Sequence, residues 1–151
     1  MYEQIFAGLK QDPYELLTVG FEEGHREMVV LRDIPFYSTC EHHFLPFFGT
    51  VSVGYLPNGR VVGISKLARV VEAYARRPQL QERLTTQIAD TINTALQPQG
   101  VAVVVRAEHL CITMRGISKP GAAMVTSAVR GDFEKFDVTR AEFLSLIQNP
   151  K

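Results

Sequence analysis

Apolar and polar residues alternate over residues 47–56 (FFGTVSVGYL). A period of two predicts a strand with one face toward a core. Pro57-Asn58-Gly59 then predicts a tight turn, after which RVVGI would return as the second arm of a hairpin. β-rich composition predicts further strands over residues 27–34, 101–107, 109–114 and 123–129.

Apolar residues spaced three and four apart predict two longer helices. The first begins at Ser65, and its apolar face comprises Leu67, Val70, Val71 and Tyr74. Pro78 separates it from the second, in which one side holds Leu80, Leu84, Ile88, Ile92 and Leu96. Weaker signals predict short helices over 2–9 and 12–17, and a final helix that follows a capping box of Thr139 and Glu142.

This order of elements predicts an α+β fold, with helices layered on a mainly antiparallel sheet. A chain of 151 residues without an internal repeat or a Ser/Gly linker is expected to form a single domain, residues 1–151.

The composition and the net charge exclude some classes of function. Lys and Arg together number 16, as do Asp and Glu, so the net charge is zero and general nucleic-acid binding is disfavoured. No apolar run approaches the ~20 residues of a membrane span, and the N-terminus lacks the pattern of a signal peptide. We therefore expect a cytoplasmic protein, in which two cysteines are thiols or metal ligands rather than a structural disulfide.

The segment TCEHHF, residues 39–44, concentrates metal-ligating residues. Cys40 and His43 have the spacing C-x-x-H, but a zinc site needs a third protein ligand. The other cysteine, Cys111, follows His109 at a spacing that would put both side chains on one face of a strand. Cys40, His43 and Cys111 would leave a fourth zinc position for water, and His42 and His109 would remain for proton transfer.

Simpler interpretations of these residues stay open at this point. Buried cysteines are usually plain core residues, and adjacent histidines can be a chance feature of a surface. A disulfide between Cys40 and Cys111 is a further alternative.

A second cluster suggests an anion site. Lys66 and Arg69 both fall in the first turn of a predicted helix, where the helix dipole disfavours cations by about 0.3–1 kcal/mol each. A bound anion would resolve this conflict, although two surface cations with their charges in water are a common and simpler explanation. Gln81 and Glu82 begin the next helix and have oxygens that could accept from guanine N–H groups. Arg115 is either a phosphate ligand or an ordinary surface arginine.

Three segments in register, STCEHHFLPFFG, GISKLARVVEAYARRPQLQERL and AEHLCITMRGISKPG, resemble GTP cyclohydrolase I. The likeness extends from about residue 20 to the C-terminus. It implies the tunnelling fold, in which antiparallel sheets of several subunits join into a β-barrel. It also implies a homodecamer of two stacked pentamers, with active sites between subunits.

The resemblance also assigns roles to residues. It implies zinc on Cys40, His43 and Cys111, with His42 and His109 as proton-transfer histidines and Ser65 beside the ribose. Lys66, Arg69 and Arg115 would hold the triphosphate, and Gln81 and Glu82 would read guanine. The implied reaction converts GTP to 7,8-dihydroneopterin triphosphate and formate, the first step of folate and pterin biosynthesis.

In one respect the chain departs from the family pattern. Family members usually carry helices before the point where this chain starts, including a Thr-Pro-x-Arg segment whose arginine helps to bind triphosphate. The alternative function, from a different class, is a catalytically silent, zinc-binding oligomeric paralogue. The presence of His42, His109 and Ser65 together argues against that alternative.

Overall fold

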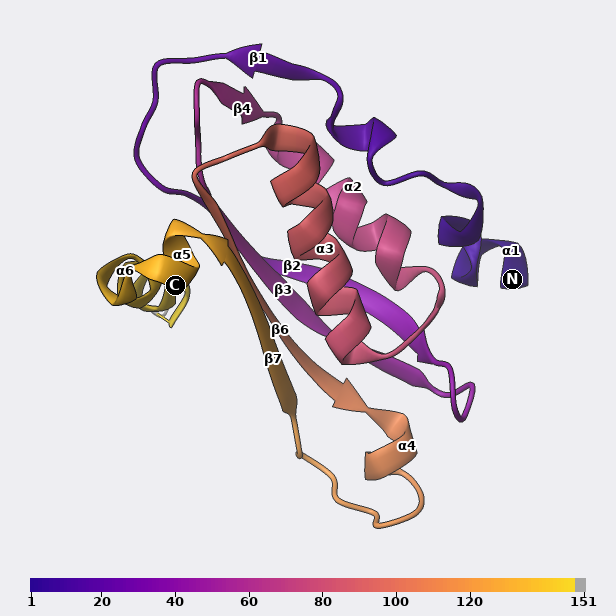
Figure 1. The fold of residues 1–151 in the computed structure, drawn as a ribbon. Helices are drawn as coiled ribbons and strands as arrows, with labels where there is room; N and C mark the ends of the chain where they lie inside the picture. The colour runs from indigo at the N-terminus through magenta and orange to yellow at the C-terminus, as the bar shows by residue number, and fades with distance from the viewer. Residues whose placement is uncertain (149–151) are drawn as a thin grey trace.

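The computed structural model describes residues 1–148, and its centre is a five-stranded sheet with two long helices against one face (Figure 1). The strand order is β5-β2-β3-β6-β7, and every pairing is antiparallel except the short one between β5 and β2. The bounds are β2 Val29–Cys40, β3 Pro46–Leu56, β5 Pro78–Gln79, β6 Gly100–His109 and β7 Met124–Gly131. The predicted α+β class is confirmed.

The main core lies between this sheet and helices α2, Ile64–Ala75, and α3, Gln81–Leu96. Both predicted apolar faces are buried, except that Leu80 precedes α3 and is only half-buried. Full burial of one such aliphatic side chain contributes about 1.5–3 kcal/mol. These two faces therefore fix α2 and α3 on the sheet.

Helices α5, Asp132–Lys135, and α6, Asp137–Gln148, pack on the opposite face near one end of the sheet (Figure 1). A Cβ atom at Gly54 would come within 2.6 Å of the Phe143 ring, so only glycine there admits this side chain. The predicted final helix is confirmed, but it begins before Thr139, so the expected capping box lies inside the helix.

The N-terminal part forms short elements along the side of α2. They are α1 Tyr2–Ile5, the 3-10 turns η1 Ala7–Lys10 and η2 Glu15–Leu17, and strand β1 Gly20–Glu22. The predicted helices over 2–9 and 12–17 are thus shorter and broken. None of the helices in residues 1–148 is long and apolar enough to cross a membrane.

The predicted hairpin after residue 56 is wrong. Strand β4, Arg60–Val62, pairs with β1 in a separate two-stranded sheet. The reason is that β3 already has β2 on one side and β6 on the other, so it has no free edge to offer.

Candidate active site

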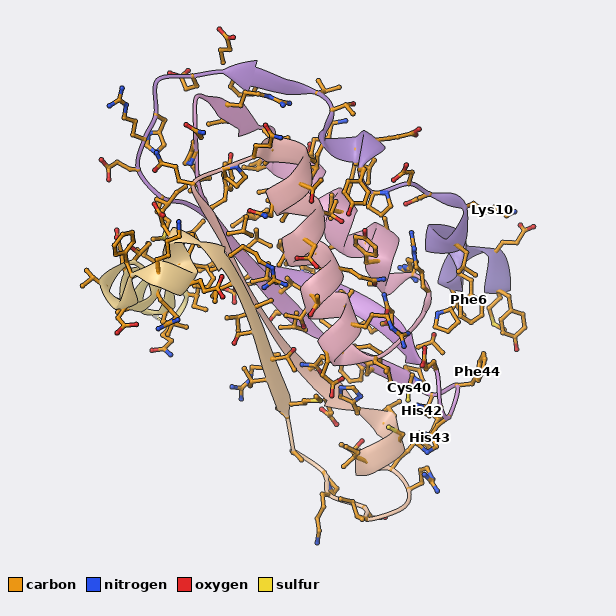
Figure 2. All side chains as sticks on the ribbon, in the orientation of Figure 1. Phe6, Lys10, Cys40, His42, His43 and Phe44 are labelled. Carbon is orange, nitrogen blue, oxygen red and sulfur yellow. The ribbon has the colours of Figure 1, made fainter. Side chains whose placement is uncertain are left out.

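The loop between β2 and β3, residues 41–45, carries His43 at one end of the sheet, directly after Cys40, the last residue of β2. Phe44 N donates to Cys40 O at 2.8 Å, and Cys40 N donates to Leu45 O at 2.9 Å, which closes the loop tightly. Phe44 has the left-handed backbone conformation (φ +54°) that so short a reversal requires. His42 and His43 thereby project from the loop beside Cys40 (Figure 2).

Cys111 reaches the same end of the sheet from another segment. Phe47, at the start of β3, pairs with His109, at the end of β6. The chain then turns through the short helix α4, Leu110–Thr113, rather than continuing as the predicted strand. That prediction is wrong, because β6 ends at His109 and the helical turn brings Cys111 back toward Cys40.

Cys40, His43 and Cys111 form one potential metal-binding group, with their ligand atoms all within 4.8 Å of one another. Cys40 Sγ lies 3.6 Å from His43 Nδ1. Ligands on one tetrahedral zinc ion, at Zn–S and Zn–N distances near 2.3 and 2.0 Å, are themselves separated by about 3.4–3.8 Å. Two thiols and an imidazole in this arrangement therefore fit a single zinc ion.

The surroundings of the cluster differ from one side to the other. Cys40 is buried, Cys111 is half-buried and His43 is exposed. Cys40 and Cys111 are both free thiols, so the alternative of a disulfide between them is not realised. The exposed side at His43 leaves space for a fourth ligand, as a catalytic zinc site requires.

His109 is held rigidly beside the cluster. Its ring stacks on Phe47, with centroids 4.5 Å apart and planes 3° from parallel. Its Nε2 lies 2.6 Å from Gln81 Oε1. Burial lowers the pKa of His109, and the charge of Glu82 opposes this shift. The ring is therefore mainly neutral at pH 7.

Gln81 determines which nitrogen of His109 carries the proton. Its own Nε2 faces three acceptors, Val105 O, Met124 O and Thr126 Oγ1, at 3.1–3.2 Å. Its Oε1 must then accept, so His109 Nε2 is the donor and His109 Nδ1 is the free acceptor. Sequence reasoning assigned Gln81 to guanine, but in this chain its amide is buried and contacts His109.

The remaining residues predicted near the metal lie around this cluster. Glu82 and Arg115 are exposed, and their charges act on the pKa values of His109 and Cys111 respectively. The ring of His42 lies 6.3 Å from that of His43, centroid to centroid. One chain thus brings four sets of residues to the same end of the sheet. They are the predicted metal ligands, the two predicted proton-transfer histidines, the predicted guanine residues and Arg115.

Ser65, Lys66 and Arg69 lie elsewhere, near the N-terminus of α2. Val62 N, just before this helix, donates to Tyr55 Oη at the far end of β3. Phe47 and Tyr55 are about 26 Å apart along the strand, at about 3.3 Å per residue. Figure 1 shows this helix start close to β4, at the opposite end of the sheet from α4. A single chain therefore does not join these residues to the metal cluster.

We expect zinc affinity to rise with pH between pH 6 and 8.5. Burial raises the pKa of the Cys111 thiol, and the nearby Cys40 adds to this effect. The Cys111 ligand is therefore protonated at neutral pH. Zinc must displace that proton, which makes the association constant increase about tenfold per pH unit for each proton released. Chelator competition at several pH values measures the slope, and a flat profile would exclude thiol ligation.

A curled, mainly antiparallel sheet with its two long helices on one face and a Cys-His-Cys cluster at its end defines a tunnelling-fold protein with a potential metal-binding group. A solved archaeosine synthase QueF-Like structure resembles it, with a TM-score of 0.55 and 25% identity, covering 69% of this chain and 93% of that one.

Sequence comparison places the chain more narrowly. The family model for GTP cyclohydrolase I matches residues 1–148. The chain is 65% identical to a GTP cyclohydrolase 1 of Dehalococcoides mccartyi, covering 99% of this chain and 80% of the relative. It is 61% identical to one of Halalkalibacterium halodurans, covering 98% and 79%. The chain belongs to the GTP cyclohydrolase I family and is an enzyme of that family.

Proposed function

We propose that this protein catalyses the zinc-dependent hydrolysis and rearrangement of GTP to 7,8-dihydroneopterin triphosphate and formate, acting as a single catalytic domain. The observation that carries the proposal is the cluster of Cys40, His43 and Cys111 beside a fixed His109, in a member of this family. The alternative of a silent paralogue gains no support from any of these contacts.

Cys40, His43 and Cys111 would hold zinc, which supplies Lewis-acid activation of water at neutral pH. His109 exchanges a proton with the guanine ring at Nδ1, because its Nε2 is engaged by Gln81. Uptake of that proton is favoured by the carboxylate of Glu82 and would be favoured further by a bound triphosphate. His42, exposed on the loop, serves as the second proton-transfer group.

Glu82 is the group best placed to read guanine. Its carboxylate is exposed next to His109 and can accept from the N–H groups of the base. Gln81 can reach the base only by giving up a contact to His109 or to β6 and β7. We therefore assign guanine selection mainly to Glu82 and the orientation of His109 to Gln81.

Lys66, Arg69 and Arg115 would bind the triphosphate, and Ser65 would contact the ribose. Within residues 1–148 neither Lys66 nor Arg69 forms an ion pair, so both cations are available to an anion at the N-terminus of α2. Because Ser65, Lys66 and Arg69 lie far from the metal cluster of their own chain, they would serve the cluster of a neighbouring subunit.

This arrangement requires a homo-oligomer, which we propose to be a decamer of two pentamers. Among the described residues β7 has a partner only on the side of β6, and the two-residue β5 leaves most of the outer edge of β2 unpaired. Open edges of this kind are normally paired or covered. Closure of several sheets into one barrel would pair them.

The proposal is tested by formate release from GTP by the zinc-loaded protein. We expect one formate per GTP, formed together with a product that has the mass of 7,8-dihydroneopterin triphosphate. Protein stripped of metal and ATP in place of GTP serve as controls, and both should yield none. Zinc-loaded protein that releases no formate would refute the proposed reaction.

A further inference from the structure

Glu41 lies between Cys40 and His42 but is not a member of the metal-binding group. Its carboxylate instead forms a two-point ion pair with Arg83, in the first turn of α3. Arg83 Nη1 lies 2.5 Å from Glu41 Oε2, and Arg83 Nη2 lies 3.1 Å from Glu41 Oε1.

A backbone contact ties the same residue to the same segment. Glu41 N donates to Gln79 O at 3.0 Å, directly after the position where Cys40 pairs with Gln79 in the short parallel ladder. Glu41 therefore binds the segment between β5 and α3 with its main chain and with its side chain. The loop that carries His43 begins from this double attachment.

The first turn of α3 is itself part of the candidate active site. It contains Gln81, whose side-chain oxygen contacts His109, and the neighbouring Glu82. The ion pair thus joins the loop that carries His43 and follows Cys40 to the helix that carries Gln81, the residue in contact with His109. Arg83 is also a cation at a helix N-terminus, where the dipole disfavours it, and Glu41 offsets that cost.

From these contacts we propose that Glu41 and Arg83 are positioning residues that set the metal loop, residues 41–45, against the first turn of α3. The proposal rests on the metal site of the proposed function. Both side chains are partly exposed, at 30% and 42%, so their pairing should contribute little to global stability. Its effect should instead appear in metal affinity, because contacts that orient ligands change affinity by about tenfold or more.

The test is a charge swap read out by zinc affinity, with Zn²⁺ alone as the probe. The variants are Glu41→Arg, Arg83→Glu and the two combined, measured by chelator competition. We expect each single reversal to weaken zinc binding about tenfold and the combined variant to recover most of that loss. Arg140→Glu is the control, because the Arg140 side chain is exposed to a similar degree (38%) and forms an ion pair with Asp137 on α6, away from the metal cluster.

The outcomes separate positioning from general destabilisation. Melting of the metal-free variants should match that of the parent chain. Single reversals that bind zinc like the parent, or a combined variant no better than the weaker single one, would overturn the proposal. Where a reversal does not fold, Glu41→Gln and Arg83→Gln take its place. Unchanged zinc affinity in both of these variants would also overturn the proposal.

The result is independent of turnover, since no GTP is present. A parent chain that binds zinc and releases no formate, with a charge swap that still restores affinity, would refute the proposed reaction and leave the positioning role intact. Formate release, together with single reversals that leave zinc affinity unchanged, would refute the positioning role and leave the proposed reaction intact.

Discussion

Replacing Cys111 with alanine is expected to remove zinc from the protein and to reduce formate release from GTP to background. The substitution leaves Cys40 and His43, and two protein ligands do not hold a zinc ion stably. Within residues 1–148 no other group of metal-ligating side chains is close enough to take its place. Zinc per chain after gel filtration and formate release from GTP are the two measurements.

Met114→Ala is the matched control for this substitution. Met114 follows the same helical turn as Cys111, but its side chain is exposed and is not a member of the cluster. It should keep one zinc per chain. Cys111→Ala protein that retained the full zinc content would show that the ligand set is assigned incorrectly.

The periodic elements were predictable from sequence because local pattern determined them. The residues predicted to form the apolar faces of α2 and α3 recur at helical spacing, and all are buried except Leu80, which precedes α3. The alternation over residues 47–56 likewise corresponds to β3. The cluster of Cys40, His43 and Cys111 was predictable for a different reason, since few residues of these types exist in the chain.

Pairings between distant segments were less predictable. Whether β4 pairs with β3 or with β1 depends on which edges the rest of the sheet occupies, and the local turn signal does not contain that information. The end of β6 at His109 was also missed, because the apolar sequence of Leu110–Thr113 is compatible with either a strand or a helical turn.

The contacts that orient the site were the least predictable. Gln81 and His109 are separated by 28 positions, and Glu41 and Arg83 by 42, so neither pair leaves a local pattern. Glu82 at a helix N-terminus has a sufficient explanation in the helix dipole, which concealed its position beside His109. A glutamate inside the motif C-E-H-H was nevertheless a signal that a further contact of the loop should be sought.

Ser65, Lys66 and Arg69 are separated from the metal cluster of their own chain. This separation predicts that two inactive variants restore activity when they are mixed. If each active site combines the metal end of one subunit with the α2 end of another, two differently inactivated chains can complement each other. One partner would be Cys111→Ala, defective at the metal end. The other would be Lys66→Ala combined with Arg69→Ala, defective at the phosphate end and assayed at low GTP concentration.

Each protein alone should be nearly inactive under these conditions. After the two are mixed, dissociated and reassembled, about a quarter of the sites should pair an intact metal end with an intact phosphate end, as expected for random assembly of a symmetric ring. Formate release should therefore return to a substantial fraction of the parent value. The control mixes Cys111→Ala with His43→Ala, which damage the same end of the chain and should restore nothing. Equal inactivity of both mixtures, with mixed oligomers demonstrated by native mass spectrometry, would mean that the site lies within one chain.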